Sequence, residues 1–410
     1  MRIRMDQLVR AVAAALDIVE GDLLGASTHH GKRIAVLCAA MGRHFQMGES
    51  ELSALATCAL FHDCALTEYI LAERMGNSPA MRLHCQYGQR DVEMLPFKTD
   101  ISGFVLYHHE LADGSGAFGK KEGELPLGAE LIAISDMLDV SSHLQTIPLE
   151  GLAAIRRRIA ASAGKHFTRR AAEAMLTVLD EEMLLLLRDG RIADTVEKII
   201  PTWSADVEDE AVFRLAGLAA RFIDYKSEFT KRHSIQIANR AWLMGEYYGH
   251  SHSLRAQLYL AAALHDIGKL STPARILEKQ GALTAEEFAT IKDHARMTYE
   301  LLKNIAGFED IRDWAYKHHE KLDGTGYPFG LRAENMDFNA RLIACLDIYQ
   351  AVSEARPYHS SRSHKETMPI LYELAQKGCI DEKIVKDIDK AMFAYAGAED
   401  LPAPPGALRL

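Results

Sequence analysis

Apolar residues recur at the spacing of an α helix through most of this chain. Two clear cases are LRAQLYLAAALHDIGKL at 254–270 and ELSALATCALFHDCAL at 51–66. Glycine and proline fall mainly between such stretches, and the alternating pattern typical of strands is scarce. The pattern predicts an all-α fold.

The histidines reveal an internal duplication. In each half a lone histidine is followed by a His-Asp pair, a third histidine, a His-His pair and an aspartate. These residues are His30, His62, Asp63, His84, His108, His109 and Asp136 in the first half, and His233, His265, Asp266, His294, His318, His319 and Asp347 in the second.

The spacing of these residues is nearly the same in the two halves. The lone histidine precedes the His-Asp pair by 32 residues in both, and the third histidine precedes the His-His pair by 24 in both. Flanking residues match as well, as in HGKRIA and HSIQIA, or LIAISD and LIACLD. We infer a duplication and expect two domains, 1–195 and 205–410, joined by a polar segment that Pro201 interrupts.

Composition excludes several classes of protein. The net charge of −10 argues against binding of a nucleic acid polymer. No run of 18 apolar residues exists, and Asp6 and Asp17 make the N-terminus resemble an amphipathic helix more than a signal peptide. The six cysteines form no CxxC pair. We therefore expect a cytoplasmic protein with reduced thiols that does not enter a membrane.

The repeated residues are those of a metal site. Five neutral imidazoles and two carboxylates suit Fe, Mn, Ni, Co or Zn, and do not suit Ca or Mg. If His265 and Asp266 occupy consecutive helical positions, they point about 100° apart, so the aspartate could bridge two metals while the histidine binds one. A single histidine of this kind is usually an ordinary helix residue, but a whole set repeated at fixed spacing favours ligands.

HDIGK at 265–269 and HHEKLDGTGYP at 318–328 resemble the HD-GYP phosphodiesterases, a subgroup of the HD superfamily of metal-dependent phosphohydrolases. The resemblance covers nearly all of 220–395, including DIYQAVSEARPY, and the first half resembles a degenerate copy. It implies two tandem HD-type helical bundles and hydrolysis of cyclic di-GMP to linear pGpG and sometimes GMP. It also implies two divalent metals, which would polarise the phosphodiester and generate a hydroxide nucleophile.

The resemblance also implies roles for the ligands. Asp266 would bridge the two metals and take part in catalysis. One metal would be held by His233, His265 and Asp347, and the other by His294, His318 and His319. Some family members carry a glutamate four residues before the first histidine, which supports a third metal. Here that position is Phe229, with Glu228 one step away, so we favour two metals.

Other residues are candidates for binding the substrate. Lys269 lies four residues after His265, so on a helix it would share that face and could contact a phosphoryl oxygen or, as a catalytic residue, stabilise developing charge. Arg356 could form a bidentate phosphate contact. The turn that contains Gly326 lets the backbone approach a ligand closely, and Tyr327 follows it. In the family this loop is also linked to a protein partner.

The first copy keeps every ligand type but lacks other parts. Leu66 stands at the lysine position, Gly116, Ala117 and Phe118 replace Gly-Tyr-Pro, and no Arg-Pro-Tyr follows Asp136. We expect this copy to be catalytically inactive, with a role in packing, dimerisation or sensing. It either retains a second metal site or is a decayed site without metal.

Three functions remain open from the sequence. The leading hypothesis is a cyclic di-GMP phosphodiesterase. The alternative substrates are the mixed guanine–adenine cyclic dinucleotide and another nucleotide of the HD-type phosphohydrolases. The third hypothesis is a non-catalytic signalling scaffold that binds metal or nucleotide. A homodimer would be compatible with each of them.

Overall fold

A computed structural model describes residues 2–24, 28–66, 80–206, 208–226, 233–279, 281–354, 361–396, 398, 401–405 and 407. Arg356, Phe229 and Glu228 lie outside these residues. The prediction of an all-α fold is confirmed, since the only strands described are two pairs of residues, β1 (Arg2–Ile3) and β2 (Ala205–Asp206), which pair with each other. The chain forms two compact units, 4–205 and 206–410, and the second also includes residues 1–3.

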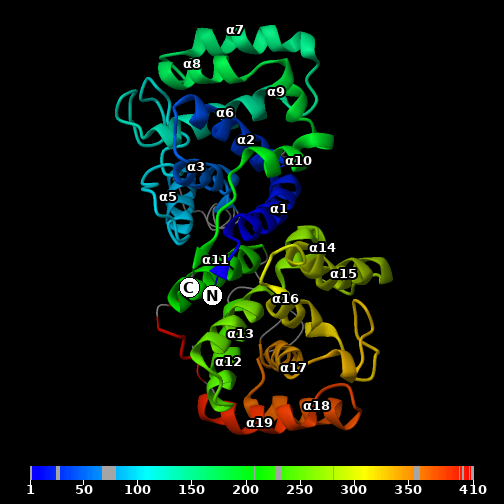
Figure 1. Cartoon of the computed structure of the whole chain (residues 1–410). Coiled ribbons are helices and arrows are strands. Elements are labelled where there is room, and N and C mark those ends of the chain that lie inside the picture. The colour runs from blue at the N-terminus through cyan, green and yellow to red at the C-terminus, as the bar shows by residue number, and fades with distance from the viewer. Residues whose placement is uncertain are drawn as a thin grey trace. The chain divides into compact units, whose positions relative to one another are not determined.

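The first unit is a bundle of helices around α2, which packs on α3, α6 and α8 (Figure 1). The middle of α2 is buried on all sides, from Ile34 to Ala39. The described helices are α1 (Met5–Leu24), α2 (His30–His44), α3 (Glu49–Leu60), α5 (Ala80–Val92), α6 (Leu127–Ser142), η1 (Leu149–Gly151), α7 (Leu152–Ser162), α8 (Arg169–Val178), α9 (Glu181–Leu186) and α10 (Asp189–Ile199).

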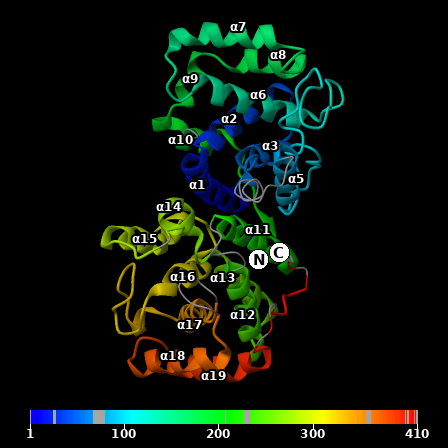
Figure 2. The ribbon, with the colours of Figure 1, turned by 180° about the vertical axis from the view of Figure 1, so that it is seen from behind.

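The second unit has the matching arrangement, with α12 packed on α13 and α17. At one end of this unit α18 and α19 lie side by side, as the view from behind also shows (Figure 2). Its helices are α11 (Asp209–Tyr225), α12 (His233–Tyr247), α13 (His252–Leu264), η2 (Ile267–Ser271), α14 (Ala274–Leu277), α15 (Ala285–Leu302), α16 (Glu309–Tyr316), η3 (Lys317–His319), η4 (Ala333–Asn335), α17 (Phe338–Ser353), α18 (His364–Gln376), α19 (Glu382–Met392) and η5 (Phe393–Tyr395).

Local sequence signals fix where the site-bearing helices of the second unit begin. Ser251 caps the N-terminus of α13, Asp337 caps α17, and Thr284 with Glu287 forms a capping box at α15. Each cap satisfies backbone N–H groups that the first helical turn leaves without partners. The start of α13 and the register of the ligand-bearing helices α15 and α17 are therefore set by their first turns.

No helix among the described residues combines the length and the apolar character needed to cross a bilayer.

Candidate metal centres

The seven predicted ligands of the second unit come together from five places in the fold. His233 begins α12, His294 lies within α15, and Asp347 lies within α17. The His-Asp pair follows the end of α13, and the His-His pair ends η3. Two groups of three have ligand atoms within 4.8 Å of one another, His233 with His265 and Asp347, and His294 with His318 and His319, and a third, His265 with Asp266 and His318, joins them.

Asp266 lies between these two groups. Its Oδ2 atom is 3.0 Å from Nε2 of His265, and its Oδ1 atom is 3.2 Å from Nε2 of His294. Nδ1 of His319 lies 3.4 Å from Oδ2 of Asp347. One carboxylate that presents each oxygen to a different group of imidazoles has the arrangement of a bridging ligand.

The His-Asp pair is not helical, contrary to the expectation from the sequence. The helix α13 ends at Leu264, and Asp266 precedes the 3-10 turn η2. The argument that Lys269 shares a helix face with His265 is therefore wrong. Lys269 instead reaches back within this turn, and its Nζ atom donates a hydrogen bond to Oδ2 of Asp266 at 2.5 Å.

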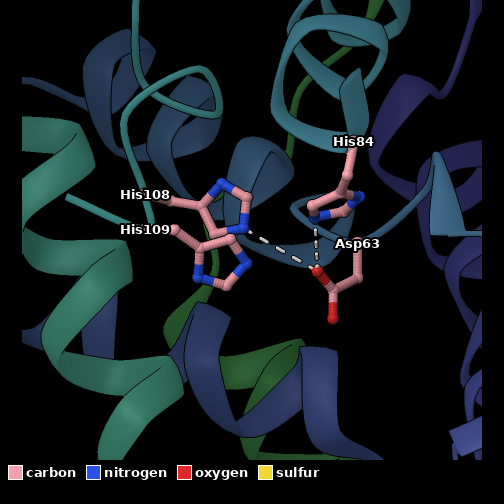
Figure 3. A group of neighbouring side chains, drawn as sticks. All are labelled: Asp63, His84, His108 and His109. Atoms are coloured by element: carbon pink, nitrogen blue, oxygen red, sulfur yellow. Dashed lines mark ion pairs between the residues drawn. The ribbon is translucent and has the colours of Figure 1, made fainter. Parts of the chain in front are cut away.

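The first unit assembles its seven residues in the same way. Oδ2 of Asp63 is 3.4 Å from Nε2 of His62, while its Oδ1 atom is 3.0 Å from Nε2 of His84. Figure 3 shows the rings of His84, His108 and His109 gathered around this carboxylate. Nε2 of His30 lies 3.3 Å from Oδ1 of Asp136.

Backbone carbonyls orient the rings in both units. Nδ1 of His265, His294 and His318 hydrogen-bonds the carbonyl three residues earlier, at 2.6–2.7 Å. In the first unit Nδ1 of His62 and His108 makes the same contact. A carbonyl partner requires the proton on Nδ1, so Nε2 keeps its lone pair for a metal.

Buried atoms support a metal at both places. Nε2 of His265, His62 and His108 is buried and has no hydrogen-bond partner among the described residues. Such atoms are rare in folded proteins unless something else binds them. Because they face carboxylates and other imidazoles, both donor sets fit divalent transition metals.

Electrostatics favour the metal-binding form for some of these groups only, because carboxylate neighbours outweigh burial at His30 and His233 and raise their pKa to about 11 and about 10. Burial disfavours the charge on Asp266, but His265 and Lys269 hold the pKa of this carboxyl well below its usual range. Burial lowers the pKa of His319 to about 3, and it lowers the pKa of His109 to about 3 as well. The aspartate is therefore ionised and these imidazoles are neutral at pH 7, as coordination requires.

The loop after the His-His pair is closed by a glutamate that sequence reasoning missed. Oε1 and Oε2 of Glu320 accept hydrogen bonds from the backbone N–H groups of Phe329 and Leu331, at 2.7 and 2.9 Å. Glu110 binds the backbone N–H groups of Phe118 and Lys120 in the same way. The only signal in the sequence was the glutamate that follows His-His in both halves.

Gly326 and Tyr327 lie where this loop meets the site. A Cβ atom on Gly326 would stand 2.3 Å from the backbone nitrogen of Lys321, so only glycine fits. The ring of Tyr327 lies 4.7 Å from that of His319, centroid to centroid.

In the first unit, a pocket of about 400 Å³ opens beside the cluster and is lined by Asp63, Leu66, Met81, His84, His108, His109, Glu110, Ala133, Asp136, Met137, Val140 and Ser141.

Comparison with known proteins identifies the two units. HD-domain family models match residues 217–384 and 28–141. The 3'3'-cGAMP-specific phosphodiesterase 1 of Vibrio cholerae is 28% identical over 395 residues, which cover 93% of this chain and 90% of that protein. The 3'3'-cGAMP-specific phosphodiesterase 3 of the same organism is 30% identical, over 78% of this chain and 68% of that protein.

Two further matches differ in extent. A cyclic di-GMP phosphodiesterase response regulator of Xanthomonas campestris is 35% identical over 182 residues, or 42% of this chain and 47% of that protein. The crystal structure of a cyclic GMP-AMP-specific phosphodiesterase of V. cholerae aligns with a TM-score of 0.66 at 21% identity, over 96% of this chain and 98% of that one. This structural likeness shows a shared fold.

Proposed function

Because this chain belongs to the HD-domain family, in its HD-GYP branch and with two HD domains in tandem, we propose that it is a metal-dependent phosphodiesterase that opens a cyclic dinucleotide. The observation that carries the proposal is the second unit's double cluster around Asp266, which retains Lys269 beside it. Similarity to cyclic dinucleotide phosphodiesterases over 93% and 78% of this chain supports the substrate class.

The second unit would hold two divalent metals. His233, His265 and Asp347 would bind one, His294, His318 and His319 the other, and Asp266 would bridge them. When bound, such a pair polarises a phosphodiester and activates water near neutral pH. Fe, Mn, Ni or Co fits this donor set best, and Zn is also compatible with it.

The remaining residues bind and orient the substrate. The side chain of Lys269 is about one-fifth exposed, so its ammonium group can turn from Asp266 toward a phosphoryl oxygen at the cluster. Tyr327 lies over His319, where its ring could stack on a base. Arg356, by its place in ARPY, remains a predicted phosphate contact.

Two cyclic dinucleotides are candidate substrates. The sequence motifs favour cyclic di-GMP, and cyclic di-GMP phosphodiesterases match between 28% and 51% of this chain. The relative that matches nearly the whole chain is specific for 3'3'-cGAMP. Because that likeness includes both HD domains, we favour the mixed dinucleotide and keep cyclic di-GMP as the second candidate.

The first unit would bind metal without hydrolysing the substrate. It keeps the ligands and the bridging carboxylate but has Leu66 where the second unit has its lysine. Its work would then be packing, dimerisation or sensing. A protein partner at the 318–330 loop is also a prediction from the family resemblance.

The deciding experiment incubates purified protein, loaded with Mn²⁺ or Fe²⁺, with each cyclic dinucleotide separately and as an equimolar mixture. Chromatography should show linear dinucleotide, formed faster from 3'3'-cGAMP. The variant His265→Ala with Asp266→Ala serves as the control for contaminating activity. If the metal-loaded protein binds a dinucleotide but leaves both intact, the scaffold hypothesis replaces the enzyme.

A further inference from the structure

In each cluster a carboxylate lies within hydrogen-bonding distance of Nδ1 of the first histidine. In the first unit Nδ1 of His30 lies 2.7 Å from Oδ2 of Asp139. In the second unit Nδ1 of His233 lies 2.7 Å from Oε2 of Glu354. The contact is the same, but the two carboxylates do not occupy matching positions.

When the two halves are aligned, the two carboxylates stand at different sequence positions. Asp139 lies three residues after Asp136, and the residue three after Asp347 is Gln350. Glu354 comes four residues later, one helical turn farther along and just past the end of α17. We propose that Glu354 is the positioning residue for His233, having taken over the role that Asp139 keeps in the first unit.

Gln350 has become part of the support for this carboxylate. Its amide nitrogen donates a hydrogen bond to Oε1 of Glu354. Its amide oxygen accepts a hydrogen bond from Nε of Arg240 at 2.6 Å. The guanidinium of Arg240 lies 4.9 Å from the ring centroid of Tyr349. Arg240 thus fixes which end of the amide faces the glutamate, and Glu354 meets a donor at each of its oxygens.

A carboxylate at this place has a chemical reason. By accepting the proton on Nδ1, it fixes the tautomer of His233 and leaves Nε2 free for a metal. An amide cannot replace it fully. One end of the amide would accept from His233 or from Gln350, and its NH₂ group would face the other donor.

The surroundings of Glu354 make the residue suitable for testing. Asp139 and its partner Arg33 have fully buried side chains, whereas that of Glu354 is 26% exposed. Glu354 lines a cavity of about 910 Å³ together with Gln350 and Arg240. A substitution there leaves no sealed hole in the core, so the fold should survive.

The test measures metal binding in the full chain. Metal-free protein is titrated with Co²⁺, and the absorption of the second-unit site is obtained by subtracting that of the His265→Ala with Asp266→Ala variant. Glu354→Gln should bind Co²⁺ at this site about 10–100-fold more weakly and with a changed absorption band. The control is Glu373→Gln, which removes an exposed carboxylate of the same unit that pairs only with Lys377 among its described contacts.

A relocated carboxylate provides the second arm. Gln350→Asp, added to Glu354→Gln, places a carboxylate where the first unit has Asp139, with Arg240 beside it in place of Arg33, and should restore most of the affinity and the absorption band. Cobalt affinity and absorption that match the Glu373→Gln control would overturn the proposal. So would a Gln350→Asp variant that restores neither.

The inference rests on the metal site of the proposed function, but its test does not depend on turnover. If the wild-type chain binds Co²⁺ tightly and opens no cyclic dinucleotide, the proposed function fails while the role of Glu354 can still be measured.

Discussion

The two HD units share the arrangement of their metal ligands and differ in the residues next to those ligands. The loop after the His-His pair is built alike, with Glu110 and Glu320 closing it and with Gly114 and Gly324 at a φ of 82°. The turn after the His-Asp pair is not alike. Lys269 covers Asp266, leaving its side chain 2% exposed, whereas that of Asp63, beside Leu66, is 15% exposed.

At this turn the second unit has its glycine in the turn itself, whereas the first unit has its glycine on the facing helix. In the second unit a Cβ atom on Gly268 would lie 1.9 Å from the carbonyl oxygen of His294, and the helix opposite carries Thr298, which binds Gly268 and the carbonyl of His265. In the first unit the matching residues are Ala65 in the turn and Gly88 on the helix. The turn that presents the lysine is thus braced by a hydroxyl in one copy only. The two copies therefore share the ligand geometry, while the lysine and the hydroxyl that braces its turn occur only in the second unit.

The largest expected effect separates the two copies directly. His265→Ala with Asp266→Ala should abolish hydrolysis, because it removes the bridging carboxylate and one imidazole from the cluster that has Lys269 beside it. Helical circular dichroism should persist, since the apolar core of α12 and α13 is unchanged. Turnover at the wild-type rate would show that the first unit carries the activity.

The second effect concerns stability and the first unit alone. Arg33 and Asp139 form a fully buried pair, with Nε and Nη2 of the guanidinium 2.7 and 3.0 Å from the two carboxylate oxygens. Arg33→Gln should lower the free energy of unfolding by about 3–5 kcal/mol, because Asp139 loses its cation in a dry site. Denaturant titration followed by circular dichroism would measure the loss.

A matched variant sharpens this second test. Arg33→Gln with Asp139→Gln copies Gln236 and Gln350, which the second unit has at these positions. It should cost less than the single change, because no charge remains buried without a partner. Equal losses would mean that packing, and not charge, is what Arg33 contributes.

The fold and the gathering of the ligands could be predicted from the sequence, because both depend on periodicity and spacing. Helical periodicity predicted the bundles. The repeated separation of 32 residues predicted that His30 would lie near His62 and His233 near His265, and the structure places them together. The helix end at Leu264 was missed, since the apolar pattern runs on through Ile267 and Leu270, which are buried in η2. Periodicity alone does not distinguish a helix from a 3-10 turn packed on the same core.

The support around the ligands could not be predicted. Glu354 and Asp139 do the same work at positions that do not match, so the repeat itself concealed them. Arg33 binds Asp139, and Arg240 binds the Gln350 that supports Glu354. Both arginines belong to other helices, and a contact between helices depends on three-dimensional packing that spacing along one segment does not encode.

The third effect is on rate alone. Lys269→Ala should keep both metals but lower turnover by about 10²–10³-fold, or about 2.7–4 kcal/mol, through the loss of one preorganised charge at the phosphate. Metal analysis and steady-state kinetics of the same preparation would measure both. Adding Leu66→Lys to His265→Ala should not restore hydrolysis, because Ala65 and Gly88 leave the first unit's turn without the glycine and hydroxyl that brace the lysine-bearing one.

The smallest effect on activity is expected from a change in the first unit. His62→Ala with Asp63→Ala removes the bridging carboxylate and one imidazole of the first cluster, so metal content should fall by the share that this unit binds. Hydrolysis should continue at the wild-type rate, because every residue proposed to act on the substrate lies in the second unit. The thermal midpoint of the metal-loaded protein should fall, since metal binding contributes directly to the free energy of folding.

The metal-free proteins serve as the control, and the difference in thermal midpoint between wild type and variant should be smaller for them. If metal content does not change while stability falls, the first cluster is a decayed site whose histidines contribute only to packing in the core. If hydrolysis stops, the two copies do not divide the work as proposed.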